Sequence, residues 1–131
     1  MSKVKIITDS CSDLPKEIVD SYDIAFLNIK VNINDQVYYD RHDLQPKDFY
    51  RLINQGKEVP KTSRITPEKF KETYQKALAD HDHVLVIAFS SKLSGILESA
   101  VVAKREMDSD KITVIDTKAA SVGQGLLVYQ A

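Results

Sequence analysis

The 131-residue chain has one cysteine, four glycines and no apolar run near the roughly 20 residues that a transmembrane helix needs. A single cysteine cannot form an internal disulfide, which fits a reducing cytoplasm. The formal net charge of -1 gives no electrostatic reason to expect a nucleic-acid or membrane-surface partner. The N-terminus also lacks the extended apolar segment of a secretory signal peptide. These absences predict a cytoplasmic protein without stable membrane insertion.

Several signatures of catalysis are missing as well. The chain has no G-x-x-x-x-G-K-[ST] phosphate loop and no G-x-S-x-G nucleophile elbow. The G-x-G at 123–125 lacks the third glycine of a dinucleotide-binding fingerprint. His81 and His83 alternate with aspartates, but no third imidazole or thiolate cluster accompanies them, so we expect no metal there. The sequence favours binding over catalysis and predicts no cofactor and no catalytic residue.

The apolar segments that are present predict an α/β fold. Hydrophobic residues make up 43% of the chain, and its length suits one compact domain over residues 1–131. The continuous apolar run at 84–89 predicts a central parallel strand, and β-branched runs at 4–8 and 112–116 predict two more. Since helical patterns alternate with these strands, we expect a three-layer domain with a parallel sheet and helices on both faces.

The clearest helix start is at Thr66, a natural N-cap that is followed by Pro67. Other helices are expected to begin at Asp13 and at Pro46, to span about 94–107, and to open at 125–131. Between the first two helices, alternation at Leu27, Ile29, Val31 and Ile33 predicts one strand with one buried face. A turn at 34–35 leads to a short partner strand at 37–39.

Four turns rich in serine, threonine and glycine, at 8–13, 62–66, 90–95 and 116–123, follow predicted strands or open predicted helices. Hydroxyl side chains beside unpaired backbone N–H groups favour an anion, and such turns gather at one edge of a parallel sheet. The turns therefore predict a site for a small anionic group. A structural interpretation stays open beside it: Ser91 or Ser94 caps a helix, and Asp9 braces neighbouring loops.

Read together, these turns resemble the DegV family of bacterial fatty-acid-binding proteins. The resemblance rests on TDSCSDLP at 8–15, PKTS at 60–63 with TPEKF at 66–70, SSKLSG at 90–95 with ESA at 98–100, and VIDT at 114–117 with SVGQG at 121–125. The four motifs occur in the family's order over nearly the whole chain. Family members are about twice this length, so the resemblance implies an N-terminal domain without the C-terminal domain.

The resemblance implies a carrier for one long-chain fatty acid, which it presents to a separate ATP-dependent fatty acid kinase that makes an acyl phosphate. The matching carboxylate ligands are Thr62 and Ser94, with Ser63 and Gly95 as neighbours. The supporting loop residues are Asp9, Ser10 and Ser121. A half-length chain is expected to expose an apolar half-pocket, and either to bind lipid weakly or to associate with itself.

The chain departs from the family pattern around these ligands. Arg64 and Ile65 stand where glutamine and proline are usual, and Ile96 and Leu97 replace a Thr-Tyr pair. The departures bear on ligand preference more than on fold. An alternative function from another class is a small phosphate-ester hydrolase or phosphotransfer domain, with Asp9 as acceptor and the turn at Ser94 as phosphate cradle.

Overall fold

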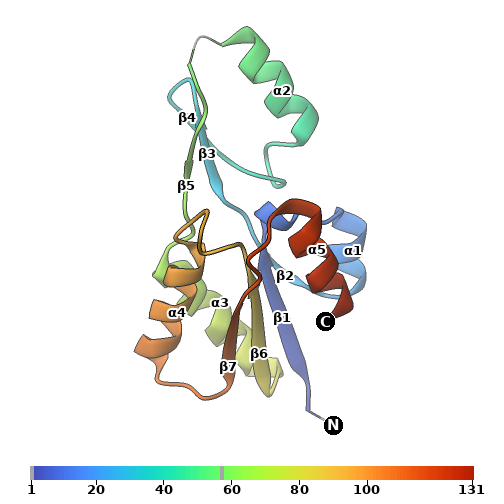
Figure 1. The fold of residues 1–131 in the computed structure, drawn as a ribbon, viewed down its shortest axis with the longest axis vertical. Coiled ribbons are helices and arrows are strands. Elements are labelled where there is room, and N and C mark those ends of the chain that lie inside the picture. Colours follow the sequence, from blue (N-terminus) through green and yellow to red (C-terminus); the bar gives the residue numbers. More distant parts are fainter. Residues whose placement is uncertain (1, 57) are drawn as a thin grey trace.

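The computed structural model describes residues 2–56 and 58–131, and its centre is a four-stranded parallel sheet in the order β2-β1-β6-β7 (Figure 1). The strands are β1 (Val4–Asp9), β2 (Ala25–Leu27), β6 (His83–Ala88) and β7 (Ile112–Asp116). The three strands predicted from apolar runs are confirmed, and the run at 84–89 forms the strand between β1 and β7.

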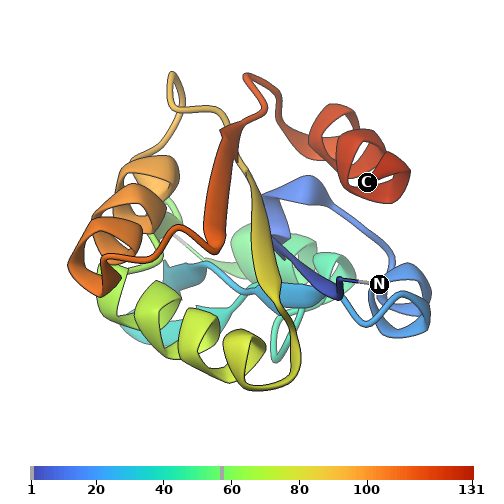
Figure 2. The same ribbon diagram turned by 90° about the horizontal axis from the view of Figure 1, so that it is seen from below.

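Helices cover both faces of this sheet, which confirms the predicted three-layer α/β fold (Figure 2). On one face lie α3 (Pro67–Asp80) and α4 (Ile96–Met107), and on the other lie α1 (Lys16–Ser21) and α5 (Ser121–Gln130). The main core lies beneath α3 and α4, where Phe70 and Tyr74 are fully buried. The Tyr74 hydroxyl donates a hydrogen bond of 3.0 Å to the carbonyl of Ala100, which joins the two helices.

A smaller antiparallel sheet extends beyond the carboxyl ends of the main strands (Figure 1). Its order is β4-β3-β5, formed by β3 (Lys30–Ile33), β4 (Gln36–Tyr39) and β5 (Lys61–Ser63), and α2 (Pro46–Gln55) packs on it. Val31, Ile33 and Leu44 form its separate core. We call β3, β4, α2 and β5 the hairpin lobe. Asn34 and Asp35 make its turn with positive φ angles of 51° and 62°, as the predicted turn requires.

The prediction of a single strand from Leu27 to Ile33 is wrong. The chain leaves the main sheet after Leu27 and enters the hairpin lobe at Lys30, so two strands of different sheets share the alternating pattern. At the break, the side-chain amide of Asn28 donates a hydrogen bond of 2.7 Å to the backbone carbonyl of Asp40. Leu27 and Ile29 pack on the main core, whereas Val31 and Ile33 belong to the core of the hairpin lobe, and therefore the period of two continues across the break.

The predicted helix starts divide into confirmed and wrong ones. The Thr66 hydroxyl accepts a hydrogen bond from the backbone N–H of Lys69 at 3.3 Å, which confirms the cap. Asp13 is not the N-cap of α1: it has a φ of 54°, ends the 3-10 turn η1 (Ser10–Ser12), and lies three positions before the first residue of α1. Helix α4 starts at Ile96, two residues later than expected. Helix α5 starts at Ser121, so the G-x-G segment lies inside it.

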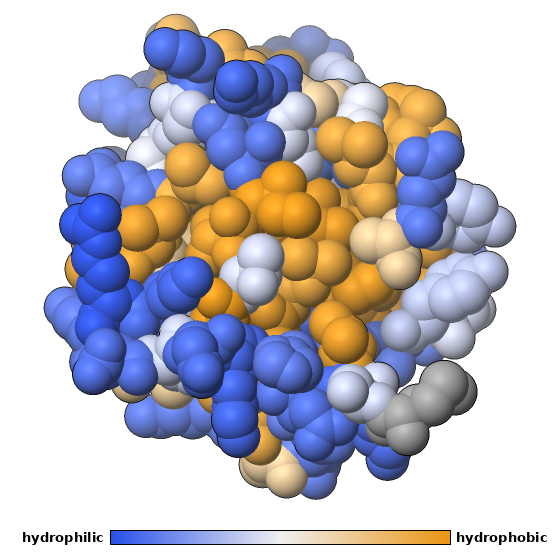
Figure 3. All heavy atoms as spheres, turned by 60° about the horizontal axis from the view of Figure 1, so that its bottom comes forward, coloured by the Kyte–Doolittle hydropathy of each residue, from blue (hydrophilic) through white to orange (hydrophobic). Residues whose placement is uncertain are grey.

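Part of the sheet face that α1 and α5 cover remains open over β6 and β7. Ile115 pairs in register with Ile87, which packs under α5, yet Ile115 is 44% exposed. Leu127 on the neighbouring α5 is 43% exposed, and Figure 3 shows a broad apolar surface in this region. A parallel sheet is ordinarily covered on both faces, so this open face is unusual for a domain. Within the described residues, no helix is long and apolar enough to cross a membrane.

Candidate functional site

The sequence-predicted turns meet where the carboxyl ends of the main strands face the hairpin lobe (Figure 1). The turn at 8–13 follows β1, the turn at 90–95 follows β6, and the turn at 116–121 follows β7. The N–H of Ser90 donates to the carbonyl of Ala119 at 3.0 Å, which joins two of these turns directly. The fourth turn, at 62–66, returns from the hairpin lobe to α3.

Asp9 is buried at the end of β1, and backbone and side-chain donors surround its carboxylate. One oxygen accepts from the N–H of Cys11 at 3.1 Å. The other accepts from the N–H of Phe89 and from the side-chain amide of Gln124, both at 3.1 Å. Burial raises the pKa of Asp9, and these hydrogen bonds oppose that rise. Since both oxygens brace neighbouring loops, a phospho-acceptor role would require these bonds to break.

Gln124 is the interior residue that sequence reasoning missed. It is fully buried in α5, and its amide nitrogen also lies 3.2 Å from the Thr8 hydroxyl and 3.4 Å from the Ile87 carbonyl. Its side-chain oxygen is buried without a hydrogen-bond partner among the described residues. The one available signal was a polar residue within an otherwise apolar helical segment. This amide fastens α5 to the ends of β1 and β6.

Ser10 and Ser121 use their hydroxyls in contacts between elements. The Ser10 hydroxyl accepts from the N–H of Ile29 at 3.1 Å, and burial raises the pKa of Asp40 in the same region. The Ser121 hydroxyl donates to the Asp13 carboxylate at 2.6 Å. Arg41 of the hairpin lobe reaches the other oxygen of that carboxylate, also at 2.6 Å. These contacts position the hairpin lobe and α5 around the edge of the sheet.

Ser91 and Ser94 have different surroundings in the turn after β6. The N–H and the hydroxyl of Ser91 both donate to Asp116, which lowers the pKa of that exposed carboxyl. The half-buried Ser94 hydroxyl accepts from the N–H of Ile96 at 3.3 Å. That bond uses an oxygen lone pair and leaves the hydroxyl proton to donate. Gly95 is the N-cap of α4 and provides no capping side chain at the positive end of the helix dipole.

Thr62 and Ser63 are exposed at the end of β5, on opposite faces of that strand. Thr62 pairs with Val31 and Ser63 with Lys30, and directly paired residues of an antiparallel ladder share a face. Thr62 is therefore on the face that α2 covers through Val31, and Ser63 is on the other. The two side chains cannot make the same contact from this strand.

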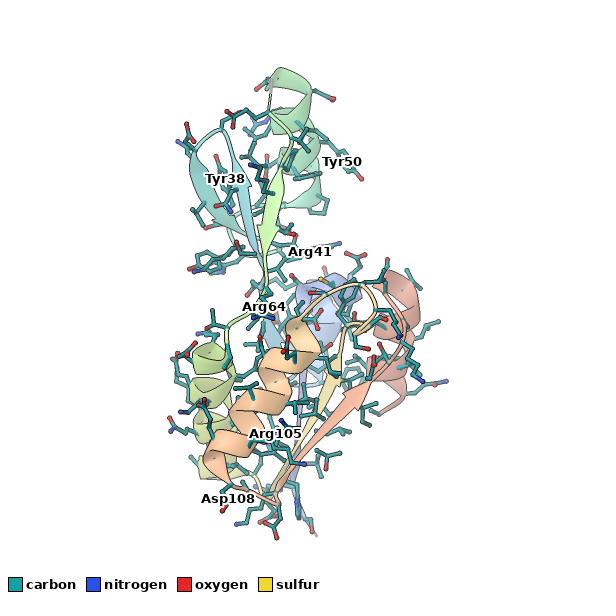
Figure 4. The ribbon with its side chains drawn as sticks, turned by 60° about the vertical axis from the view of Figure 1, so that its left-hand side comes forward. Tyr38, Arg41, Tyr50, Arg64, Arg105 and Asp108 are labelled. Atoms are coloured by element: carbon teal, nitrogen blue, oxygen red, sulfur yellow. The ribbon has the colours of Figure 1, made fainter. Side chains whose placement is uncertain are left out.

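Arg64 joins the end of β5 to the start of α4 (Figure 4). Its Nη1 donates to Glu98 Oε2 at 3.0 Å. A Cβ added to Gly95 would lie only 2.4 Å from the same nitrogen, so the guanidinium packs directly on the Gly95 backbone. Through Arg64, the segment that carries Thr62 meets the turn that carries Ser94. The sequence distinguished Arg64 only as a departure from a family pattern.

A cleft of about 730 Å³ lies between the hairpin lobe and α3. Lys30, Tyr39, Arg64 and Thr73 are among its lining residues, and both polar and apolar side chains contribute. The lining includes neither Thr62 nor Ser94, because the cleft lies on the Lys30 face of the hairpin lobe. Among the described residues, no group of three or more histidines, cysteines or carboxylates could hold a metal ion.

A family model described as "Uncharacterised protein, DegV family" matches residues 3–131. A DegV domain-containing protein of Caldanaerobacter subterraneus subsp. tengcongensis is 37% identical over 131 residues, which are 100% of this chain and 46% of that protein. The solved structure of a DegV family protein from Thermus thermophilus, described by its fatty-acid binding, has a TM-score of 0.91 at 35% identity. The match covers 98% of this chain and 45% of the Thermus thermophilus chain.

DegV of Bacillus subtilis, described as a fatty acid binding protein, superposes with a TM-score of 0.90 at 26% identity. The match covers 98% of this chain and 46% of that one. The chain thus spans about half the length of the relatives that it matches.

Proposed function

Because the chain belongs to the DegV family, we propose that it is the N-terminal domain of a carrier that binds a long-chain fatty acid. The hydroxyls of Thr62 and Ser94 hold the carboxylate, with Gly95 beside them and Ser63 next along the strand. Relatives of known structure described as fatty-acid-binding proteins support the ligand class. The main support for this position of the carboxylate is the contact of Arg64 with Gly95, which joins the segment of Thr62 to the turn of Ser94.

The chemistry of the site suits a carboxylate that is bound and not transformed. Hydroxyl donors and the N-terminal end of α4 stabilise a negative charge without a metal or a catalytic base. Gly95 has no side chain, and the Arg64 guanidinium packs on its backbone in that space. Burial of the acyl tail, at about 0.8 kcal/mol per methylene, then supplies most of the affinity.

The position of the site favours presentation to a second protein. Ser91, Lys92 and Leu93 beside Ser94 are exposed, and Leu93 is 66% exposed. A carboxylate held at Ser94 would therefore lie near the surface, within reach of an ATP-dependent fatty acid kinase. The carrier keeps the tail covered while the kinase transfers a phosphoryl group to a carboxylate oxygen, which yields an acyl phosphate and ADP.

Mass spectrometry of an organic-solvent extract of the purified full-length protein tests this function. We expect one fatty acid per protein molecule, and its mass reports the chain length and the unsaturation. The extracted protein should rebind the same acid on titration. A full-length protein that yields no fatty acid, and that binds none on titration, would contradict the proposal.

A further inference from the structure

We infer that Arg64 is a charge-selecting ligand of the proposed site: its guanidinium pairs with the bound carboxylate and makes the site prefer acids to neutral lipids. This inference rests on the proposed function, since it concerns the same head group. It adds a positive charge, from this chain's own residue, to the hydroxyls of Thr62 and Ser94.

Arg64 lies close to the proposed carboxylate site. Its Nη1 lies where a Gly95 side chain would project, at the residue next to Ser94 in the chain. Arg64 directly follows Ser63 at the end of β5, and Figure 4 shows it at the junction of the hairpin lobe with α4. The guanidinium therefore lies on Gly95, the residue that follows Ser94, and its own residue is two positions from Thr62 in the chain.

Arg64 also has N–H donors available for a ligand. A guanidinium has five N–H donors in a planar fork that matches a carboxylate, and Glu98 engages one nitrogen. The Arg64 side chain is 54% exposed, so its remaining donors face an open region. Glu98 is 73% exposed and forms a weak, solvent-screened pair. A ligand carboxylate can therefore compete for Arg64 with little loss.

The opposite charges of Arg64 and Glu98 predict opposite effects on acid binding. Hydroxyl donors bind both a carboxylate and an alcohol, more strongly the carboxylate, whereas a guanidinium adds a charge–charge attraction that only the carboxylate gains. The Glu98 carboxylate, by contrast, repels the ligand and competes for Arg64. Arg64 and Glu98 should consequently change acid affinity in opposite directions and leave the affinity for a neutral lipid nearly unchanged.

The test titrates the full-length protein with a long-chain fatty acid and with the fatty alcohol of equal length. Arg64→Gln should weaken acid binding by about tenfold, with alcohol binding changed less than about twofold. Glu98→Gln should strengthen acid binding by a few fold. Arg105→Gln, at the other end of α4, removes the same charge away from the site and should leave both affinities unchanged (Figure 4).

Gly95→Ala provides a second variant, because the added methyl group displaces the flexible guanidinium without strain at a φ of -81°. It should lower the acid-to-alcohol preference as Arg64→Gln does. Equal preferences in wild type, Arg64→Gln and Arg105→Gln would overturn the inference. If the wild type binds acid and depends on Thr62 and Ser94, that result leaves the proposed function standing. If the wild type binds no acid, both are overturned.

Discussion

The side-chain amide of Gln124 donates a hydrogen bond of 3.1 Å to the carboxylate of Asp9, which lies 115 residues earlier in the chain. The bond connects α5 to the carboxyl end of β1 in the buried layer beneath the candidate site. Asp9 also accepts from the backbone of the loop after β6. A buried carboxylate thus holds three chain segments in place under the turns that carry the proposed ligands.

The Asp9→Asn variant should show how this carboxyl affects stability across pH. Because burial raises the pKa of Asp9, the folded protein binds more protons than the unfolded chain between the ordinary Asp pKa and the raised one. The contribution of Asp9 is full below its unfolded pKa and is lost as pH rises through its folded pKa. Asparagine stays neutral at every pH. The free energy of unfolding of the wild type, relative to that of Asp9→Asn, should therefore fall as the pH rises above about 4.

Urea unfolding of both proteins at a series of pH values measures this difference. The comparison cancels the other carboxyl groups, such as Asp116, whose pKa is lowered. If the wild type gains stability relative to Asp9→Asn as the pH rises, or if the difference stays constant, burial does not dominate the pKa of Asp9.

Two glycines of α5 should respond oppositely to the same substitution. A Cβ at Gly125 would lie 2.7 Å from the backbone oxygen of Ser12, so Gly125→Ala must shift the helix or η1. We expect a loss of about 1–3 kcal/mol in the free energy of unfolding. At Gly123 the nearest atom is the Ala119 Cβ at 3.6 Å, an ordinary contact. Gly123→Ala should stabilise the exposed helix turn by up to about 1 kcal/mol.

Urea unfolding of the two variants gives both values. Loss of stability in both would mean that α5 tolerates no alanine for a reason other than its contact with Ser12. A gain in both would mean that the close approach at Gly125 relaxes at no cost.

The hydroxyl of Thr66 should matter more for stability than that of Thr73 in the same helix. Thr66→Ala removes the N-cap bond to the Lys69 N–H, and we expect a loss of about 1 kcal/mol. The Thr73 hydroxyl donates to a carbonyl of the helix, a bond that slightly destabilises helices. Thr73→Ala should therefore stay within about 0.5 kcal/mol of wild type. Thermal unfolding measures both, and equal losses would argue against the cap.

The sequence predicted three strands of the main sheet, β1, β6 and β7, because they are apolar runs between helical patterns. Thr66 and Pro67 form a local signal that needs no knowledge of the fold. The break after Leu27 was missed because the apolar residues at 27, 29, 31 and 33 alternate without interruption, although Leu27 packs in the main core and Val31 and Ile33 pack in the hairpin lobe. Asp13 was misassigned because an acid before a proline is typical of a cap, whereas its partners, Arg41 and Ser121, are remote in sequence.

The candidate site was only partly predictable. The turns at 90–95 and 116–121 could be placed at one edge, because the carboxyl ends of parallel strands meet there. The strand β5 and the opposite orientations of Thr62 and Ser63 could not, because they depend on pairing with β3. The contact between Arg64 and Gly95 depends on how the hairpin lobe packs on the main sheet, for which no local pattern exists.

Titration of the full-length protein with a long-chain fatty acid, in wild type, Thr62→Ala/Ser94→Ala and Ser63→Ala, tests the central claim most directly. Each lost hydrogen bond to a charged group costs about 1.5–3 kcal/mol, so the double variant should bind about 100-fold more weakly or worse. Ser63→Ala, on the opposite face of β5, should bind nearly as wild type does. A double variant with wild-type affinity would contradict the placement of the carboxylate at Thr62 and Ser94.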